Sequence, residues 1–170
     1  MTEESRLSPE LVRDLMTVGV VTCLPETPVV ELARLFLEEE IEEIVVLEEG
    51  NALGVVGQDE LIRAYATGVY QGLTAEEIMR EGVPQVPPEI PLTAAAQVML
   101  DRGGRALFLM HHAAGMEYPA AVITYRHFLR HMTAKDAGEL RDLGILAERR
   151  TPLDTFITRR NAARKKKSNH

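Results

Sequence analysis

The side chains best suited to metal chemistry in this chain are two histidines, His127 and His131, which lie four residues apart. On a helix this spacing places both imidazoles on one face, where they could share a metal ion. No third acidic or sulfur ligand stands near them in the sequence. A pair of surface histidines is therefore the favoured interpretation, and we expect no metal site.

Other reactive side chains have similarly plain interpretations. Cys23 is the only cysteine, so an internal disulfide is excluded, and its apolar neighbours predict burial rather than redox chemistry. The acidic segment 38–43 lacks the loop glycine and alternating oxygen ligands of a calcium site, which favours a solvated helix end. Because no nucleophile is paired with a base and no glycine-rich phosphate loop precedes a lysine, we expect no catalysis.

Composition limits the class of protein further. The 170 residues are 45% hydrophobic and 26% charged, as in an ordinary globular protein. Aromatic residues make up only 5% with no tryptophan, so a nucleic-acid surface of stacked rings is not expected. No apolar run approaches the roughly 20 residues that cross a bilayer, and the first residues are acidic rather than basic. These features predict a cytoplasmic protein without a membrane partner.

Charge divides the chain into two unlike parts. Residues 1–140 contain 10 Lys and Arg against 23 Asp and Glu, whereas residues 141–170 contain 9 against 3. An acidic body repels nucleic acid and anionic lipid, so such partners could meet only the basic end. A solvated terminus that pairs with an acidic neighbour is the favoured alternative. Helical spacing of Leu140, Leu143 and Leu146 predicts packing on the body or on an unknown protein partner.

The elements that must position these residues occur twice. Residues 12–16 return as 75–79, 63 residues later, and the apolar run 44–47 returns as 107–110. Such duplication is typical of a tandem binding module. Each half predicts the order strand, helix, strand, strand, helix, and therefore an α/β fold. The predicted elements of the first half, after a short helix at 9–16, are 20–24, 28–40, 44–47, 53–57 and 59–70; those of the second half are 83–86, 92–101, 106–110, 120–124 and 125–132.

Two details of these elements can be checked directly. The helix over 59–70 is expected to turn Leu61, Ile62 and Tyr65 inward. The match between the halves slips by four residues after the run 107–110, and we expect the insertion to form a longer loop over 113–119.

The repeated motifs resemble the cystathionine-β-synthase (CBS) domain, present here as the tandem pair called a Bateman module. The resemblance rests on the "DLMT" segment at 14–17, its "EIMR" echo at 77–80, the proline-flanked helix starts and the strand-to-helix ends 54–62 and 121–129. It implies repeats at 8–70 and 71–132, related by a pseudo-twofold axis, followed by a helical, basic extension at 133–170. It also implies a regulatory homodimer that requires no cofactor and binds adenosine compounds such as AMP, ATP, NAD or S-adenosylmethionine between its repeats.

The family's ligand motif places a glycine, then a Ser or Thr hydroxyl for phosphate, then an aspartate for ribose, at the start of the last helix. In the first repeat the hydroxyl position is Gly57 and the acid is Glu60; in the second, Thr124 is kept but His127 replaces the acid. The ligand-binding residues that the resemblance implies are Thr22, Gly57, Gln58, Asp59, Glu60, Arg105, Thr124, Tyr125, Arg126 and His127.

Two functions of different class follow from this incomplete motif. The first is an adenine-nucleotide sensor with one working cleft that draws residues from both halves, with Thr124, Arg105 and Arg126 facing phosphate. The second is a ligand-free dimeric scaffold whose clefts no longer bind and whose helical extension docks a protein. Contact of the basic end with nucleic acid is a weaker third hypothesis.

Overall fold

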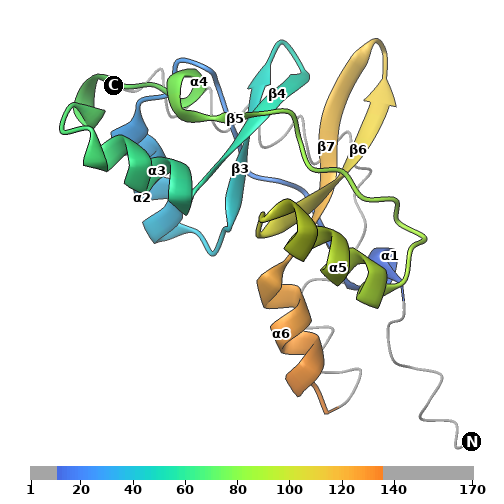
Figure 1. The fold of residues 1–170 in the computed structure, drawn as a ribbon. Helices are drawn as coiled ribbons and strands as arrows, with labels where there is room; N and C mark the ends of the chain where they lie inside the picture. Colours follow the sequence, from blue (N-terminus) through green and yellow to red (C-terminus); the bar gives the residue numbers. More distant parts are fainter. Residues whose placement is uncertain (1–10, 136–170) are drawn as a thin grey trace, which may run out of the picture.

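The computed structural model describes residues 11–135, which form two small β-sheets with helices packed around them (Figure 1). Residues 9 and 10 of the predicted first helix and nearly all of the predicted extension 133–170 lie outside the described residues. Among the helices that are described, none is both long and apolar enough to cross a membrane.

The first sheet contains four strands in the order β2-β3-β4-β5. Strand β2 runs parallel to β3, whereas β4 is antiparallel to both of its neighbours, β3 and β5. Helix α2 connects β2 to β3, because parallel neighbours in a sheet need a crossover connection between them. The bounds are β2 (Thr22–Cys23), α2 (Val29–Glu38), β3 (Glu43–Glu48), β4 (Asn51–Gly57) and β5 (Arg80–Glu81).

The second sheet has the order β1-β7-β6, with all pairs antiparallel. The strand expected over 83–86 is reduced to a single parallel bridge between Gln85 and Phe108. Pro84 and Val86 flank this bridge and exchange backbone hydrogen bonds of 2.8 and 3.0 Å with Phe108. The bounds are β1 (Thr17–Val18), β6 (Ala106–Ala113) and β7 (Met116–Thr124).

The two halves exchange their first segments. Strand β1 belongs to the first repeat in sequence but pairs with β7 of the second, and β5 of the second repeat pairs with β4 of the first. Two short helices, α1 (Val12–Leu15) and α4 (Ala75–Ile78), travel with these strands and bury apolar residues in the opposite core. Each sheet therefore has, at one edge, a short strand supplied by the other half of the chain.

The two hairpins have the same turn, which corrects one expectation. Glu49-Gly50 and Ala114-Gly115 both have positive φ at each residue, 48° and 87° in the first and 51° and 73° in the second. Two successive residues with positive φ are the mark of the type I′ turn, which suits the twist of paired strands. The longer loop predicted over 113–119 is wrong, because the four extra residues lengthen β6 and β7 instead.

Four longer helices pack around the sheets. In one of them, the inward-facing residues differ from those predicted. In the helix predicted over 59–70, Leu61 packs against the core, but Ile62 and Tyr65 are 68% and 66% exposed. The inward positions are Glu60 and Ala64, one helical turn apart, because the Glu60 carboxylate is held by polar partners below the helix. Leu37 of α2 is likewise 89% exposed. The remaining helices are α3 (Gln58–Ala66), the 3-10 turn η2 (Tyr70–Gly72), α5 (Leu92–Arg102) and α6 (Tyr125–Thr133).

A shared apolar core joins the two sheets. Val45 and Val55 of the first sheet pack with Phe108 and Tyr118 of the second, and all four are buried. Figure 1 shows α2 and α3 outside the first sheet and α1 and α5 beside the second. The candidate site lies between the two halves of the chain. There the start of β3, the end of β4 and the residue before β6 come together.

Candidate functional site

The site is built where strand β4 ends and helix α3 begins. Gly57 is the N-cap of α3, and its backbone N–H donates a 2.9 Å hydrogen bond to Glu60 Oε2. A carboxylate three residues into a helix satisfies one of the backbone donors that the first turn leaves free. Glu60 is therefore turned back toward the sheet, where it is buried.

The second carboxylate oxygen of Glu60 faces two arginines. Arg63 Nη1 lies 2.9 Å from Glu60 Oε1, and Arg80 Nε lies 3.2 Å from the same oxygen. Arg63 comes from the next turn of α3, whereas Arg80 is supplied by β5, the strand exchanged from the second half of the chain. Both oxygens of Glu60 are thus engaged by protein groups.

Glu43 lies on the other side of Arg80. Its Oε1 is 2.6 Å from Arg80 Nη2 and 3.4 Å from the backbone N–H of Arg105. The Glu43 side chain is only 3% exposed. A solvated face is the wrong prediction for this residue, although Glu38, Glu39 and Glu40 are exposed. The reason is that Glu43 opens β3 directly opposite Gly57, whose missing side chain leaves room for a carboxylate.

Burial raises the pKa of Glu43 above its usual value, and the charge of Arg80 together with the Arg105 backbone N–H opposes that rise. The arrangement is a buried carboxylate held between an arginine and a backbone donor. Such a pair is costly to break by removing one partner, because the remaining charge stays buried.

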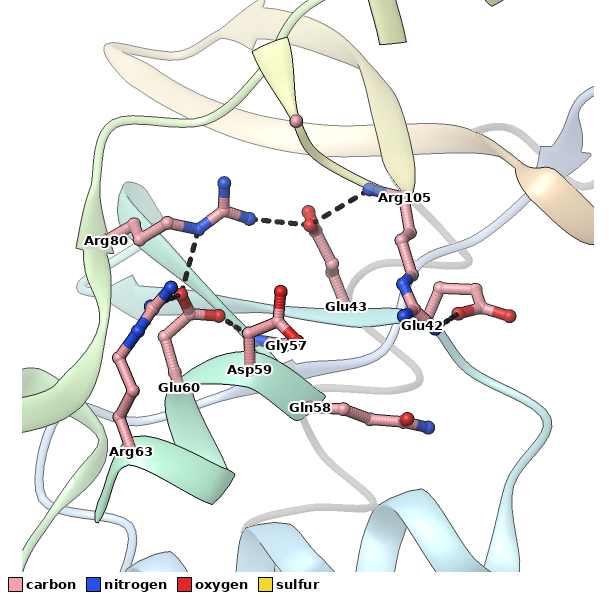
Figure 2. Close-up of a pocket in the computed structure, with 10 residues that line it drawn as sticks. Glu42, Glu43, Gly57, Gln58, Asp59, Glu60, Arg63, Arg80 and Arg105 are labelled. Atoms are coloured by element: carbon pink, nitrogen blue, oxygen red, sulfur yellow. Dashed lines mark hydrogen bonds and ion pairs between the residues drawn. The ribbon is translucent and has the colours of Figure 1, made fainter. Parts of the chain in front are cut away.

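A pocket that is open to solvent adjoins these residues (Figure 2). Of the residues predicted to bind a ligand, Gly57, Gln58, Asp59, Glu60 and Arg105 line it. The sequence did not single out the other lining residues, which are Glu42, Glu43, Arg63, Arg80 and Gly103. Arg80 could have been found from the sequence, because it is the last residue of the repeated "EIMR" segment. Glu43 could not, because its burial depends on a glycine in the neighbouring strand.

The equivalent position in the second half holds neutral groups. Thr124, the N-cap of α6, donates its backbone N–H to His127 Nδ1 at 3.0 Å, and its hydroxyl oxygen is 2.9 Å from the same nitrogen. Because Nδ1 accepts a hydrogen bond, the ring proton is on Nε2, which lies 2.7 Å from Thr17 Oγ1. Thr17 comes from the exchanged strand β1.

His127 is consequently not half of a surface pair. Burial lowers its pKa to about 4, and the nearby charge of Arg130 acts in the same direction. Both ring nitrogens face threonines, so neither is free for a metal. Within residues 11–135, no cluster of three or more His, Cys, Asp or Glu side chains is placed to hold a metal ion.

The two positions correspond residue by residue. We call Glu43, Gly57, Glu60 and Arg80 the charged corner, and their counterparts Ala106, Thr124, His127 and Thr17 the neutral corner. Glu43 pairs across its sheet with Gly57, and Ala106 pairs likewise with Thr124. A large residue thus faces glycine in the first corner, and a small residue faces threonine in the second.

The remaining predicted residues are separated from the pocket or border it. Thr22 pairs with Val45 in the first sheet and does not line the pocket. Tyr125 donates its backbone N–H to the carbonyl of Arg105 at 3.2 Å, which ties the start of α6 to the pocket wall. Arg126 is 3.1 Å from Glu40, so it bridges the two halves at the surface.

Cys23 is buried in the apolar core beneath α2 of the first sheet, as its neighbours in the sequence predict. Burial raises its pKa to about 12. The thiol is therefore protonated at neutral pH and a poor nucleophile.

Comparison with known proteins identifies the family that the sequence matches. The CBS domain model matches residues 12–67 and 75–134, which together make up more than half of the chain. No functionally curated protein matches the sequence.

Solved structures share the fold at low sequence identity. The CBS domain pair of protein MJ0100, in complex with 5′-methylthioadenosine and S-adenosyl-L-methionine, is 19% identical with a TM-score of 0.62, covering 72% of this chain and 98% of that one. CBSX2 in complex with AMP is 22% identical with a TM-score of 0.57, covering 73% and 96%. A putative acetoin utilization protein (AcuB) from Vibrio cholerae is 22% identical with a TM-score of 0.60, covering 82% and 98%.

Proposed function

This chain belongs to the CBS domain family as a tandem pair, and we propose that it is a non-catalytic regulatory protein that binds one adenosine-containing ligand at the charged corner. The observation that carries the proposal is the pocket itself, which is lined by polar side chains from both halves of the chain. The complexes of similar CBS pairs with S-adenosyl-L-methionine, 5′-methylthioadenosine and AMP support the ligand class.

The chemistry of the pocket suits a nucleoside. Carboxylates can accept hydrogen bonds from sugar hydroxyls, and guanidinium groups can donate to oxygen acceptors of a ligand. Arg105 is about half exposed and lies 3.9 Å from Glu42, so its charge is available to a ligand that carries phosphate. The neutral corner offers no comparable charge, since its threonines and His127 satisfy one another.

Regulation follows from where the pocket lies. Arg80 reaches the pocket from the exchanged strand β5, and Arg105 directly precedes strand β6 of the other sheet. A ligand that contacts both binds differently when the two halves change their relative orientation. Differential affinity of this kind is what a ligand needs to shift a conformational equilibrium.

Thermal unfolding with added ligand tests the proposal. AMP, ADP, ATP, NAD and S-adenosylmethionine are each added at millimolar concentration, with guanosine monophosphate as the control compound. A ligand at about 100 times its Kd stabilises by roughly 2.7 kcal/mol, which raises Tm by several degrees. A rise with an adenosine compound and none with the guanosine control is expected, and no rise with any compound overturns the proposal.

A second candidate function is a dimeric scaffold, and exposed apolar side chains favour it. Large apolar side chains are exposed in both halves, on helices α2, α3, α5 and α6 and at Val69, and exposed apolar surface that is contiguous marks protein–protein contacts. They are Leu37, Ile62, Tyr65, Val69, Leu100, Leu129 and Met132. We propose that these faces associate in a homodimer, which is compatible with ligand binding. Light scattering on the wild type and on the double variant Leu37→Glu/Ile62→Glu tests this, with loss of the dimer expected in the variant and a monomeric wild type contradicting it.

The compartment is part of the same proposal. A single buried cysteine requires no oxidising environment, and we place the protein in the cytoplasm. Fractionation of cells that express a tagged chain would check this placement.

A further inference from the structure

Two buried polar atoms in the charged corner lack a hydrogen-bond partner. Among residues 11–135, the buried side-chain nitrogen and oxygen atoms without a hydrogen-bond partner are Glu43 Oε2 and Arg80 Nε. Arg80 Nε is 3.2 Å from Glu60 Oε1 and forms an ion pair there, but it makes no hydrogen bond. Buried polar atoms are satisfied in the great majority of cases, and each exception calls for a partner.

The two atoms belong to side chains that already touch each other and that both line the pocket. Glu43 Oε1 and Arg80 Nη2 are 2.6 Å apart, so the unpartnered oxygen of Glu43 belongs to a side chain that is bonded to Arg80, whose Nε faces Glu60. Figure 2 shows the two side chains facing each other across the pocket wall, with Glu60 beneath Arg80. One is an acceptor as a carboxylate and the other is a donor.

Glu60 is already committed to the protein. The family motif would assign the sugar to this acid, but Gly57 holds one of its oxygens and Arg63 and Arg80 face the other. Glu43 carries the carboxylate oxygen that is still without a partner. A sugar hydroxyl that enters the pocket therefore gains more from Glu43 than from Glu60.

The pairing of one acceptor with one donor selects the chemistry of the ligand group. A hydroxyl both donates and accepts, so it can donate to Glu43 Oε2 and also accept from the guanidinium group of Arg80. A phosphate oxygen would accept from Arg80 but would be repelled by Glu43, and an ammonium group would donate to Glu43 but offer nothing to Arg80. A metal ion is disfavoured because the described residues contain no suitable ligand cluster.

We infer that Glu43 and Arg80 together bind a ribose hydroxyl of the ligand, and that they determine specificity for ribose over deoxyribose. The inference rests on the proposed function, since it assigns the sugar of an adenosine-containing ligand to these two side chains. Neither residue lies in the motif that the family resemblance implies for ligand binding, which spans 54–60 in this repeat.

Isothermal titration with three nucleosides tests the inference without changing the protein. Adenosine, 2′-deoxyadenosine and 3′-deoxyadenosine are each titrated into the wild-type chain. Loss of a hydrogen bond to a charged group weakens binding by about tenfold or more, so at least one deoxy compound is expected to bind that much more weakly. Equal affinity for all three overturns the inference but leaves the proposed function standing. No binding of adenosine at millimolar concentration also overturns the inference, and the thermal unfolding series then decides the proposed function separately.

Variants then assign the effect to these side chains. Glu43→Gln keeps the shape and an acceptor for Arg105 but removes the charge, and we expect the preference for ribose to fall below about threefold. Glu48→Gln is the matched control, because Glu48 is an exposed glutamate at the far end of the same strand. A preference that persists in Glu43→Gln, or that is lost equally in Glu48→Gln, would overturn the assignment. Circular dichroism confirms that both variants are folded.

Discussion

The charged and neutral corners occupy equivalent positions on one repeated frame but hold opposite chemistry. In both, the third residue of a helix caps the residue that ends the preceding strand: Glu60 caps Gly57, and His127 caps Thr124. In both, that capping residue also meets a side chain from an exchanged strand, Arg80 in one case and Thr17 in the other. The backbone geometry is shared, and only the side chains decide whether the corner is ionic.

The two corners differ in how far their polar groups are satisfied within the protein. The neutral corner satisfies its polar groups internally, since each nitrogen of His127 faces a threonine oxygen or N–H. The charged corner leaves one acceptor and one donor without hydrogen bonds. A binding site needs such unsatisfied groups, and a structural cap does not.

The largest expected effect comes from removing the cation of the charged corner. Arg80→Met leaves the buried Glu43 carboxylate with only the Arg105 backbone donor, and we expect the free energy of unfolding to fall by about 3 kcal/mol. The counterpart Thr17→Val removes one neutral hydrogen bond and should cost about 1 kcal/mol. Urea unfolding at pH 7 measures both, and equal losses would contradict the distinction between the corners.

A double variant sharpens this comparison. Glu43→Ala/Arg80→Thr gives the charged corner two of the four residues of the neutral one, and the buried Glu60 keeps its ion pair with Arg63, so no carboxylate at position 43 is left unpaired. We expect it to be more stable than Arg80→Met alone, because removing both partners of a buried pair costs less than removing one. A double variant that is less stable than the single variant would count against that explanation.

The neutral corner should respond to acid. The pKa of His127 is about 4 in the folded chain, below the usual value of about 6.5, so the unfolded chain takes up the proton first as the pH falls. Stability from this group is therefore present above pH 6.5 and lost between pH 6.5 and 4, by up to about 3 kcal/mol.

The measurement is a comparison of unfolding free energies across that range. His127→Gln can keep both contacts without titrating, so the difference between wild type and variant should shrink or reverse as the pH falls. His112→Gln replaces an exposed histidine and should follow the wild type. A difference between wild type and His127→Gln that does not change with pH would refute this account of the neutral corner.

A smaller effect is expected from restoring the missing hydroxyl of the charged corner. Gly57→Ser places a donor at the N-cap of α3, and the affinity for AMP relative to adenosine should rise by about tenfold. A Cβ at Gly57 would lie 3.2 Å from Glu60 Oε2, so the cap must shift slightly to admit the side chain. Thr124→Val, the matched change in the neutral corner, should leave this ratio unchanged. Titration calorimetry decides, and a ratio that responds only to Thr124→Val would place the phosphate in the other corner.

The smallest effect is expected at the surface contact between the halves. Glu40 is 69% exposed and pairs with Arg126 and Arg130 at 3.1 and 3.2 Å. Glu40→Gln should reduce the free energy of unfolding by less than about 1 kcal/mol, and high salt should abolish the loss. The loss in Arg80→Met should persist in high salt because Glu43 is buried. Urea unfolding at low and high ionic strength separates the two cases.

The sequence predicted the duplicated frame because that frame depends on apolar spacing and turn residues. The run 44–47 lies in a strand and is buried, its copy 107–110 lies in a strand and is buried at 107–108, and the helices after Thr27 and Ile90 begin where the prolines indicate. The exchange of β1 and β5 was not predicted, because each is only two residues long and pairs with a strand distant in the sequence.

The site was predicted in part, for a physical reason that individual residues make clear. Gly57, Glu60 and Arg105 lie at the pocket, since their places follow from the repeated motif and the start of a strand. Glu43 was assigned to a solvated acidic run because its burial requires the glycine across the sheet and an arginine from the exchanged strand. His127 was assigned to the surface because its partner Thr17 is 110 residues away.

The central claim is that the charged corner, and not the neutral one, holds the ligand. The most direct test is the change in backbone amide NMR shifts when adenosine is added to the wild-type chain. We predict that the largest changes fall on Glu43, Gly57 and Arg80. Largest changes at Thr17, Thr124 and His127, or no localised change with saturating adenosine, would contradict the claim.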